Sequence, residues 1–233
     1  MPYSVKPAQE QAEFKESPVK KELAFQKLAD CGVVAVIRAQ SESQLQDIAR
    51  ALVDGGVIGI EVTMTTPKAI QGIEKLADAM GDKCVVGVGT ILEAATCADA
   101  IHAGAEFVVS PVLNPAIIET TRKLGKISVP GAYTPTEILT AWSAGADVVK
   151  IFPATTLGPG YLKDLLAPMP FLRLTPTGGV DLKTAPDWIK AGAVMVGAGS
   201  SLVSKEALAK NDWSAITNTA KQFVEAIKSA RAK

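Results

Sequence analysis

A single lysine interrupts an apolar stretch in the second half of the chain. Lys150 lies within residues 146–153, where Val148, Val149 and Ile151 surround it and a proline ends the run. An unpaired ammonium is costly to bury, and burial lowers the pKa of a lysine from about 10.4 toward neutrality. A partly neutral lysine attacks carbonyl carbon, which is the first requirement of Schiff-base chemistry. The alternative is a structural lysine that pairs with a carboxylate or extends its amine to solvent.

A glutamate occupies a similar setting earlier in the chain. Glu61 lies within residues 58–63, among glycine, valine and isoleucine. If both side chains point into a shared interior, Glu61 and Lys150 could simply neutralise each other. The same proximity suits catalysis, because a carboxyl with a raised pKa can pass protons to and from the oxygen of a carbinolamine. We favour catalysis because a structural ion pair does not require the other polar residues and glycine turns described below.

Eight apolar runs supply the strands that must position these residues. They begin near residues 33, 58, 84, 107, 127, 148, 171 and 194, and their spacing of roughly 20–26 residues is typical of repeated βα units. The runs are continuously apolar, as expected for parallel strands that are covered on both faces.

The segments between the runs have helical spacing, and capping residues mark where the helices begin. Thr66-Pro67, Asn114-Pro115 and Asp212-Trp213 are the predicted starts. Thr134 and Glu137 have the spacing of a capping box, so we expect Glu137 to cap a helix rather than to act as a catalytic acid.

Eight βα units in about 200 residues predict a closed (β/α)8 TIM barrel, near the lower end of its size range. An open doubly wound sheet is the alternative, since strand count does not prove closure. Ser17-Pro18 predicts an extra N-terminal helix that ends near Gly32. Residues 1–16 are predicted to be a flexible N-terminal extension, and residues 17–233 a single barrel domain, because no linker divides them.

Barrel enzymes place their active sites at the carboxyl ends of the strands. Two glycine turns, at 177–179 and 197–201, follow the last two predicted strands, where barrels commonly bind phosphate through backbone N–H groups. Ser200 or Ser201 would add a hydroxyl. The candidate substrate-binding residues are Arg38, Thr63, Thr90, Pro111, Phe152, Thr177, Gly178, Gly179, Gly199 and Ser200.

Composition argues against several classes of function. The 233 residues carry no formal net charge and are 48% hydrophobic, which is ordinary for a soluble globular protein. No basic cluster suggests nucleic acid, and no apolar run near the start suggests a signal peptide or membrane span. Three scattered cysteines favour a reduced, cytoplasmic location. The single histidine, His102, is expected at the surface and argues against a histidine-based metal site.

Taken together, the motifs resemble those of the 2-keto-3-deoxy-6-phosphogluconate (KDPG) aldolase family, which includes 4-hydroxy-2-oxoglutarate (KHG) aldolases. The most specific are Lys-Ile-Phe-Pro at 150–153 and Pro-Thr-Gly-Gly-Val at 176–180. The similar segments run in order from about residue 30 to 203 and so cover most of the chain. The others lie at 34–39, 60–63, 86–90, 107–111, 130–131, 134–137 and 196–200.

The resemblance implies a class I aldolase on a (β/α)8 barrel, usually a homotrimer, with no metal or other cofactor. Lys150 would form the Schiff base and Glu61 would be the general acid/base. Thr90 would bind the pyruvyl carboxylate. Gly178, Gly179 and Ser200 would bind the phosphate, and Phe152 and Pro111 would line the pocket. One position departs from the family: many members carry arginine four residues after the glutamate, where this chain has Thr65. Arg38 would then supply the positive charge.

The predicted reaction is the cleavage of KDPG, a step of the Entner-Doudoroff pathway, to pyruvate and glyceraldehyde 3-phosphate. Cleavage of KHG to pyruvate and glyoxylate is a second expected activity. The alternatives are a 2-keto-3-deoxy-6-phosphogalactonate aldolase, or a phosphate-binding barrel without a Schiff-base lysine. The latter would be an isomerase, a synthase or a non-catalytic sugar-phosphate binding protein. We expect a small keto acid and pyruvate as ligands, and neither nucleic acid nor membrane as a partner.

Overall fold

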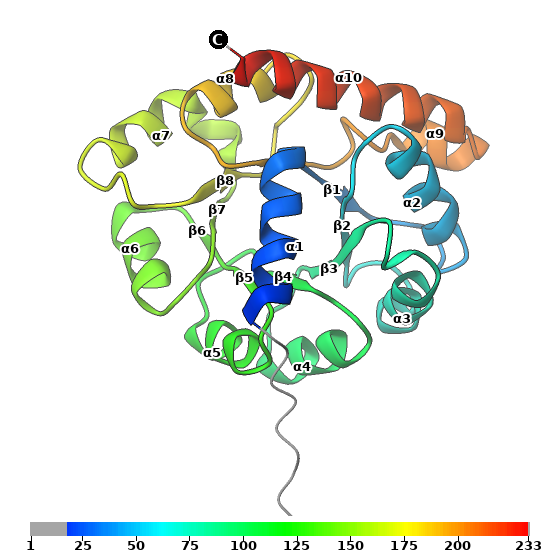
Figure 1. Ribbon diagram of the computed structural model, residues 1–233, viewed down its shortest axis with the longest axis horizontal. Helices are drawn as coiled ribbons and strands as arrows, with labels where there is room; N and C mark the ends of the chain where they lie inside the picture. Colours follow the sequence, from blue (N-terminus) through cyan, green and yellow to red (C-terminus); the bar gives the residue numbers. More distant parts are fainter. Residues whose placement is uncertain (1–17, 233) are drawn as a thin grey trace, which may run out of the picture.

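The computed structural model describes residues 18–232, in which helices surround a curled parallel sheet (Figure 1). The strands are β1 (Val33–Ile37), β2 (Gly59–Thr63), β3 (Val85–Gly89), β4 (Phe107–Val109), β5 (Ile127–Val129), β6 (Gly131–Ala132), β7 (Val149–Ile151), β8 (Leu174–Pro176) and β9 (Val196–Ala198). The α-helices are α1 (Pro18–Cys31), α2 (Gln44–Asp54), α3 (Ala69–Met80), α4 (Ala94–His102), α5 (Pro115–Lys123), α6 (Pro135–Ser143), α7 (Gly158–Leu166), α8 (Ala185–Lys190), α9 (Lys205–Lys210) and α10 (Trp213–Arg231). The extension predicted at residues 1–16 lies outside the described part of the chain.

The strands form two hydrogen-bonded sheets rather than one ring of eight. The larger sheet has the order β5-β4-β3-β2-β1-β9, and the smaller one has the order β6-β7-β8. The predicted fifth strand is divided into β5 and β6 at Pro130, because proline has no N–H to donate to a sheet. The fold is therefore an α/β fold with a curled parallel sheet, as the βα repeats predict.

Hydrogen bonds connect the two sheets on both sides. Between β5 and β7, the N–H groups of Asp147 and Val148 donate to the Ser128 carbonyl, and the Lys150 N–H donates to the Pro130 carbonyl. Between β8 and β9, Val194 N–H donates to Leu174, and the next contact is an isolated parallel bridge from Thr177 to Gly197.

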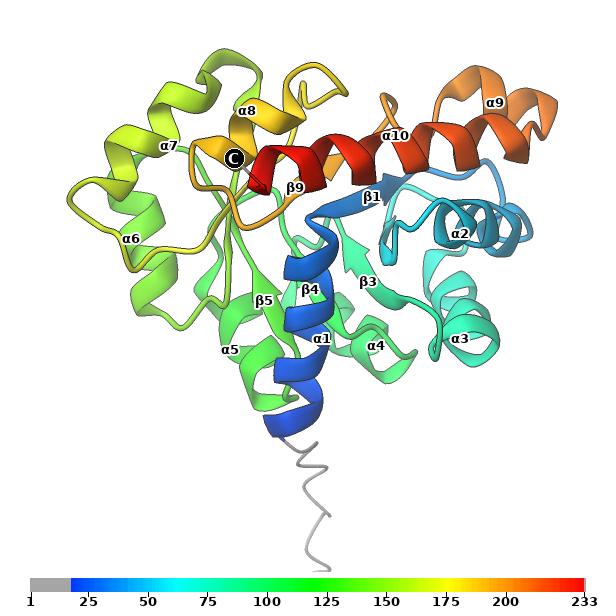
Figure 2. The same cartoon turned by 45° about the horizontal axis from the view of Figure 1, so that its top comes forward.

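Helix α1 covers the end of the curled sheet where the strands begin (Figures 1 and 2). Its Phe25 and Leu28 side chains pack against interior residues near the starts of several strands, including Val34, Phe107 and Met195. Burying side chains of this size contributes about 1.5–3 kcal/mol each. At the far end of α1, Arg231 of α10 donates hydrogen bonds to the Ala29, Asp30 and Val194 carbonyls. The extra N-terminal helix is thus present, and it closes the end opposite the loops that follow the strands.

Most of the predicted helix starts are confirmed. Asn114 and Asp212 accept hydrogen bonds as N-caps of α5 and α10, and Thr134 and Glu137 form the capping box of α6. The start at Thr66-Pro67 is wrong: α3 begins two residues later, after Lys68, whose backbone is left-handed. The seventh strand also begins later than predicted, because β8 starts at Leu174.

Two smaller expectations concern the surface and the membrane. His102 is exposed at the end of α4, as predicted. Within residues 18–232, none of the helices combines the length and the apolar character that crossing a membrane requires.

Candidate active site

Lys150 is held inside the curled sheet by the central position of β7. Its side chain is only 6% exposed, and its Nζ atom lies 4.6 Å from the centre of the Phe152 ring. Both side chains point to the same side because residues two apart in a strand share a face. Within the described part of the chain, the ammonium forms no hydrogen bond or ion pair with another residue. Its contact with a protein group is therefore the Phe152 ring, and the side chain lines a small cavity instead of pairing with a carboxylate.

Glu61 reaches the same interior from β2. Its side chain is 3% exposed and lies directly over Gly89 of β3, where a Cβ atom would overlap the carboxylate. Glu61 and Lys150 both line a small cavity of about 20 Å³. They interact electrostatically, although no hydrogen bond joins the two side chains in the described structure. The two groups therefore face the same small cavity without forming a salt bridge in the described structure.

Burial shifts the pKa of each member of the pair toward its neutral form. Desolvation raises the pKa of Glu61, against the opposing effect of the Lys150 and Arg38 charges. Desolvation likewise lowers the pKa of Lys150, against the opposing effect of Glu61 and with a small contribution from Arg38. A neutral amine beside a protonated carboxyl is the state that attack on a ketone requires.

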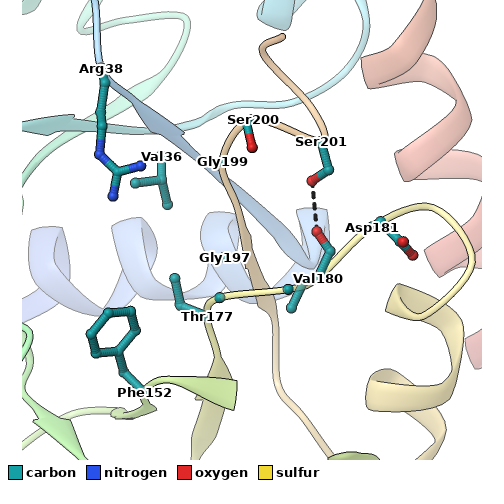
Figure 3. Close-up of a pocket in the computed structure, with 12 residues that line it drawn as sticks. Val36, Arg38, Phe152, Thr177, Val180, Asp181, Gly197, Gly199, Ser200 and Ser201 are labelled. Atoms are coloured by element: carbon teal, nitrogen blue, oxygen red, sulfur yellow. Dashed lines mark hydrogen bonds between the residues drawn. The ribbon is translucent and has the colours of Figure 1, made fainter. Parts of the chain in front are cut away.

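A larger cavity of about 390 Å³ opens above the pair, on the side of the loops that follow the strands (Figure 3). Arg38, at the end of β1, and Phe152, after β7, both extend into it. The two glycine turns that follow β8 and β9 form the facing wall. Thr177 and Gly197 line both cavities, so the larger cavity adjoins the small one that holds the pair.

The wall formed by the glycine turns presents unpaired backbone donors. Within residues 18–232, the N–H groups of Gly178, Gly179, Ser200 and Ser201 donate to no protein acceptor. Gly178 and Gly179 have φ values of 95° and 73°, which L-residues with a Cβ rarely adopt. The Ser201 hydroxyl donates to the Val180 carbonyl at 2.6 Å (Figure 3). Ser200 is therefore the serine whose hydroxyl is available, and the wall has the chemistry of an anion site.

The structure brings most of the predicted residues together but leaves three outside the walls of both cavities. The Thr63 hydroxyl is buried and donates to the Ile37 carbonyl at 3.0 Å, with Thr65 as a second partner. Pro111 is half-buried in the loop after β4. Thr90 is half-buried after β3, with a φ of 62°. A β-branched residue in this conformation is strained, and such strain gathers at functional sites.

Several residues of the larger cavity were not predicted from the sequence. They are Val36, Val180 and Asp181, whereas Gly197 and Ser201 were predicted as part of the second glycine turn. Val36 was detectable, since it precedes Arg38 by two positions and so shares its face of β1. Asp181 gave no such signal; its carboxylate accepts hydrogen bonds from Thr184 and Lys183, which lower its pKa.

Comparison with known proteins places this arrangement in a family. Residues 25–219 match the family model described as KDPG and KHG aldolase. The chain belongs to this family. It is an aldolase, and aldolases are lyases.

Relatives in the family resemble the chain over most of its length. The 2-dehydro-3-deoxy-6-phosphogalactonate aldolase of Escherichia coli (strain K12) is 32% identical over 73% of this chain and 83% of that protein. The 2-dehydro-3-deoxy-phosphogluconate aldolase of Treponema pallidum (strain Nichols) is 32% identical over 87% of this chain and 97% of that protein. A solved KDPG aldolase from Legionella pneumophila, with pyruvate captured as a covalent carbinolamine, matches with a TM-score of 0.80 and 28% identity, over 89% of this chain and 98% of that one.

The contact between Gly89 and Glu61 gives a first testable prediction. Gly89→Ala should lower kcat by roughly 10²-fold or more, because the new methyl group must displace the Glu61 carboxylate, which we expect to act as the general acid/base. Overpacking should also reduce the free energy of unfolding by about 1–3 kcal/mol. Steady-state pyruvate release and thermal unfolding measure the two effects. Gly160→Ala is the matched control, since nothing lies within 4 Å of a Cβ there. Wild-type kcat in Gly89→Ala would contradict the position assigned to Glu61.

Proposed function

We propose that this aldolase cleaves KDPG to pyruvate and glyceraldehyde 3-phosphate through a Schiff base on Lys150. The observation that carries the proposal is the buried, unpaired Lys150 ammonium, which shares a cavity with the Glu61 carboxyl. The same pair lies beneath a larger cavity that has unpaired N–H donors on one wall and Arg38 on another. The carbinolamine of pyruvate in the Legionella relative supports this chemistry.

The reaction begins when the neutral Lys150 amine attacks the C2 ketone of the substrate. The resulting carbinolamine loses water after Glu61 protonates its oxygen, and an iminium ion remains. Glu61, acting through a water molecule, then removes the proton of the C4 hydroxyl. The C3–C4 bond breaks, its electrons enter the iminium to form an enamine, and the aldehyde is released. Protonation at C3 and hydrolysis of the iminium release pyruvate and regenerate the amine.

The larger cavity would hold the remainder of the substrate. The N–H groups of Gly178, Gly179 and Ser200 and the Ser200 hydroxyl would bind the phosphate, with Thr177 and Gly199 shaping the same wall. Arg38 would supply the positive charge that an arginine provides in many family members at the position of Thr65. Phe152 would pack against the carbon chain of the substrate. Thr90 would hold the pyruvyl carboxylate, with Pro111 behind it. Thr63 would act through the end of β1, since its hydroxyl bonds to Ile37.

Two related substrates fit the same mechanism. KHG would give pyruvate and glyoxylate. It has no phosphate, so it would leave the proposed phosphate site at the glycine turns unoccupied. The galactonate counterpart of KDPG is the second candidate, which the relative from E. coli favours by its name. The rival functions, a phosphate-binding isomerase or synthase and a non-catalytic binding protein, would need neither Lys150 nor Glu61.

We further infer that residues 17–233 form one domain, in which the two sheets join into a closed (β/α)8 barrel. The hydrogen bonds from β7 to β5 and the bridge between Thr177 and Gly197 support this closure. A cytoplasmic homotrimer is the assembly and location that the resemblance favours, and sedimentation analysis of the purified protein tests the trimer.

The proposed function is tested with purified protein and three substrates. Pyruvate release, followed with lactate dehydrogenase, should be detected with KDPG, and removing the phosphate should lower kcat/KM by roughly 10²-fold or more, since several charge-assisted hydrogen bonds are lost. Comparing KDPG with its galactonate epimer identifies the preferred C4 configuration. Borohydride with pyruvate should leave a reduced adduct on Lys150. An adduct on another lysine, or none, would overturn the proposal.

A further inference from the structure

The small cavity beneath Lys150 and Glu61 has no role in the reaction as described above. Its volume of about 20 Å³ is too small for a keto acid, yet it exceeds the roughly 10–15 Å³ that one water molecule needs. Most of its wall is apolar, from Val34, Phe107, Val109, Val129 and Met195. The polar side chains in the wall are those of Glu61, Lys150, Thr175 and Thr177. A water molecule needs two to four such partners to remain bound.

Thr175 is the residue that points to an occupant. It lies on β8 beside Lys150, with which it pairs in register, and it is 4% exposed. Within the described part of the chain its hydroxyl has no hydrogen-bond partner. This hydroxyl is not sealed among packed atoms, because the side chain lines the cavity. A water molecule in the cavity would satisfy it.

We propose that this cavity holds one ordered water molecule, bound by the Thr175 hydroxyl, through which a proton passes from Lys150 to Glu61. This inference rests on the proposed function, because it assigns Lys150 and Glu61 the roles given there. Thr175 is then a positioning residue, since it acts on the reacting groups through the water.

The transfer is balanced in protons and charge. The Lys150 ammonium gives a proton to the water oxygen, and the same water gives one of its own protons to the Glu61 carboxylate. The water is regenerated, the amine becomes neutral, and the carboxyl becomes protonated. The amine can then attack the ketone, and the carboxyl can protonate the carbinolamine oxygen. Both groups are thereby prepared for the first two steps of the reaction.

The surroundings of the cavity favour this neutral pair. Burial raises the pKa of Glu61 and lowers the pKa of Lys150. Among the residues that line the cavity, from β1, β2, β4, β5, β7, β8 and β9, these are the titratable ones. β3 contributes Gly89 beneath Glu61. Arg38 is the other charge that acts on both, and it stabilises the neutral amine and the ionised carboxyl.

The test compares Thr175→Val, which has the same shape without the hydroxyl, with Thr175→Ser, which keeps the hydroxyl. The readout is the rate of borohydride-trapped adduct formation with pyruvate, measured from about pH 6 to 9. Thr175→Val should slow trapping by roughly tenfold near neutral pH, recovering at higher pH where the amine deprotonates without help. Thr175→Ser should stay within about twofold of the wild type. A second variant, Val129→Ile, fills the cavity from an apolar position and should show the same defect as Thr175→Val.

Structural and kinetic outcomes can each overturn the proposal. A high-resolution crystal structure of the wild-type protein without pyruvate should contain the water, and an empty cavity would refute it. An unchanged pH profile in Thr175→Val, or an equal loss in Thr175→Ser, would also refute it. The proposed function fails separately, since it predicts an adduct on Lys150 in the wild type whether or not Thr175 matters.

Discussion

Replacing Lys150 by alanine is expected to abolish turnover, with kcat reduced by about 10⁵-fold or more, the scale on which enzymes lose rate when their nucleophile is removed. Lys150→Arg should be equally inactive, because a guanidinium keeps the charge but does not attack a ketone. Both variants should fold, since Lys150 forms no hydrogen bond or ion pair among residues 18–232. The measurement is pyruvate release from KDPG, combined with mass mapping after borohydride.

The chain contains a matched internal control for this result. Lys126 is as buried as Lys150, at 5% exposed, but its ammonium lies 3.1 Å from the Glu106 carboxylate. Burial alone therefore does not distinguish the two lysines. We expect no adduct on Lys126 and wild-type kcat in Lys123→Ala, an exposed lysine of α5. Pyruvate release that survives Lys150→Ala would contradict a Schiff base on Lys150.

Glu61→Gln should lower kcat by roughly 10²–10⁴-fold, the usual contribution of a general acid/base. The amide is nearly the same shape, so substrate binding and folding should change little. Because burial raises the pKa of Glu61, the limb that this group contributes to the pH profile of kcat should lie above its ordinary value of 4.5. This limb should vanish in the variant, as a pH series of kcat would reveal.

The control for Glu61→Gln is the same substitution at Glu137. That carboxylate accepts hydrogen bonds from the N–H groups of Tyr133 and Thr134, which lower its pKa in the capping box of α6. Glu137→Gln should reduce the free energy of unfolding by about 0.3–1 kcal/mol, because a charge at the helix N-terminus is lost, and should leave kcat unchanged. If Glu137→Gln lost activity while Glu61→Gln kept it, the two glutamates would have been assigned the wrong roles.

Lys150 and Glu61 were identified from the sequence because each is a charged residue within an otherwise apolar strand. A lysine or glutamate within an apolar strand is unfavourable unless another part of the protein compensates, so Lys150 and Glu61 were visible without any structure. The glycine turns were visible for a related reason, since Gly178 and Gly179 adopt backbone conformations that suit glycine. The burial of both charged residues is confirmed, whereas their catalytic roles stay predictions.

Other features depend on tertiary geometry that a linear pattern does not contain. The division into two sheets arises at Pro130 and in the sparse contact between β8 and β9, where strand twist decides which hydrogen bonds form. The bond from Thr63 to Ile37 connects two strands and depends on their register. Thr175 is an ordinary strand residue in the sequence. Its hydroxyl lines the small cavity only because of how the neighbouring strands are placed.

Helix α1 determines how molecules can enter and leave. Because Phe25 and Leu28 fill one end of the interior, we expect the larger cavity above Lys150 to be the route for both substrate and products. In the proposed mechanism, glyceraldehyde 3-phosphate would occupy the outer part of that route after cleavage, while the pyruvyl fragment would stay attached to Lys150 farther in. The proposed mechanism therefore implies ordered product release, in which the aldehyde leaves first and the keto acid leaves last.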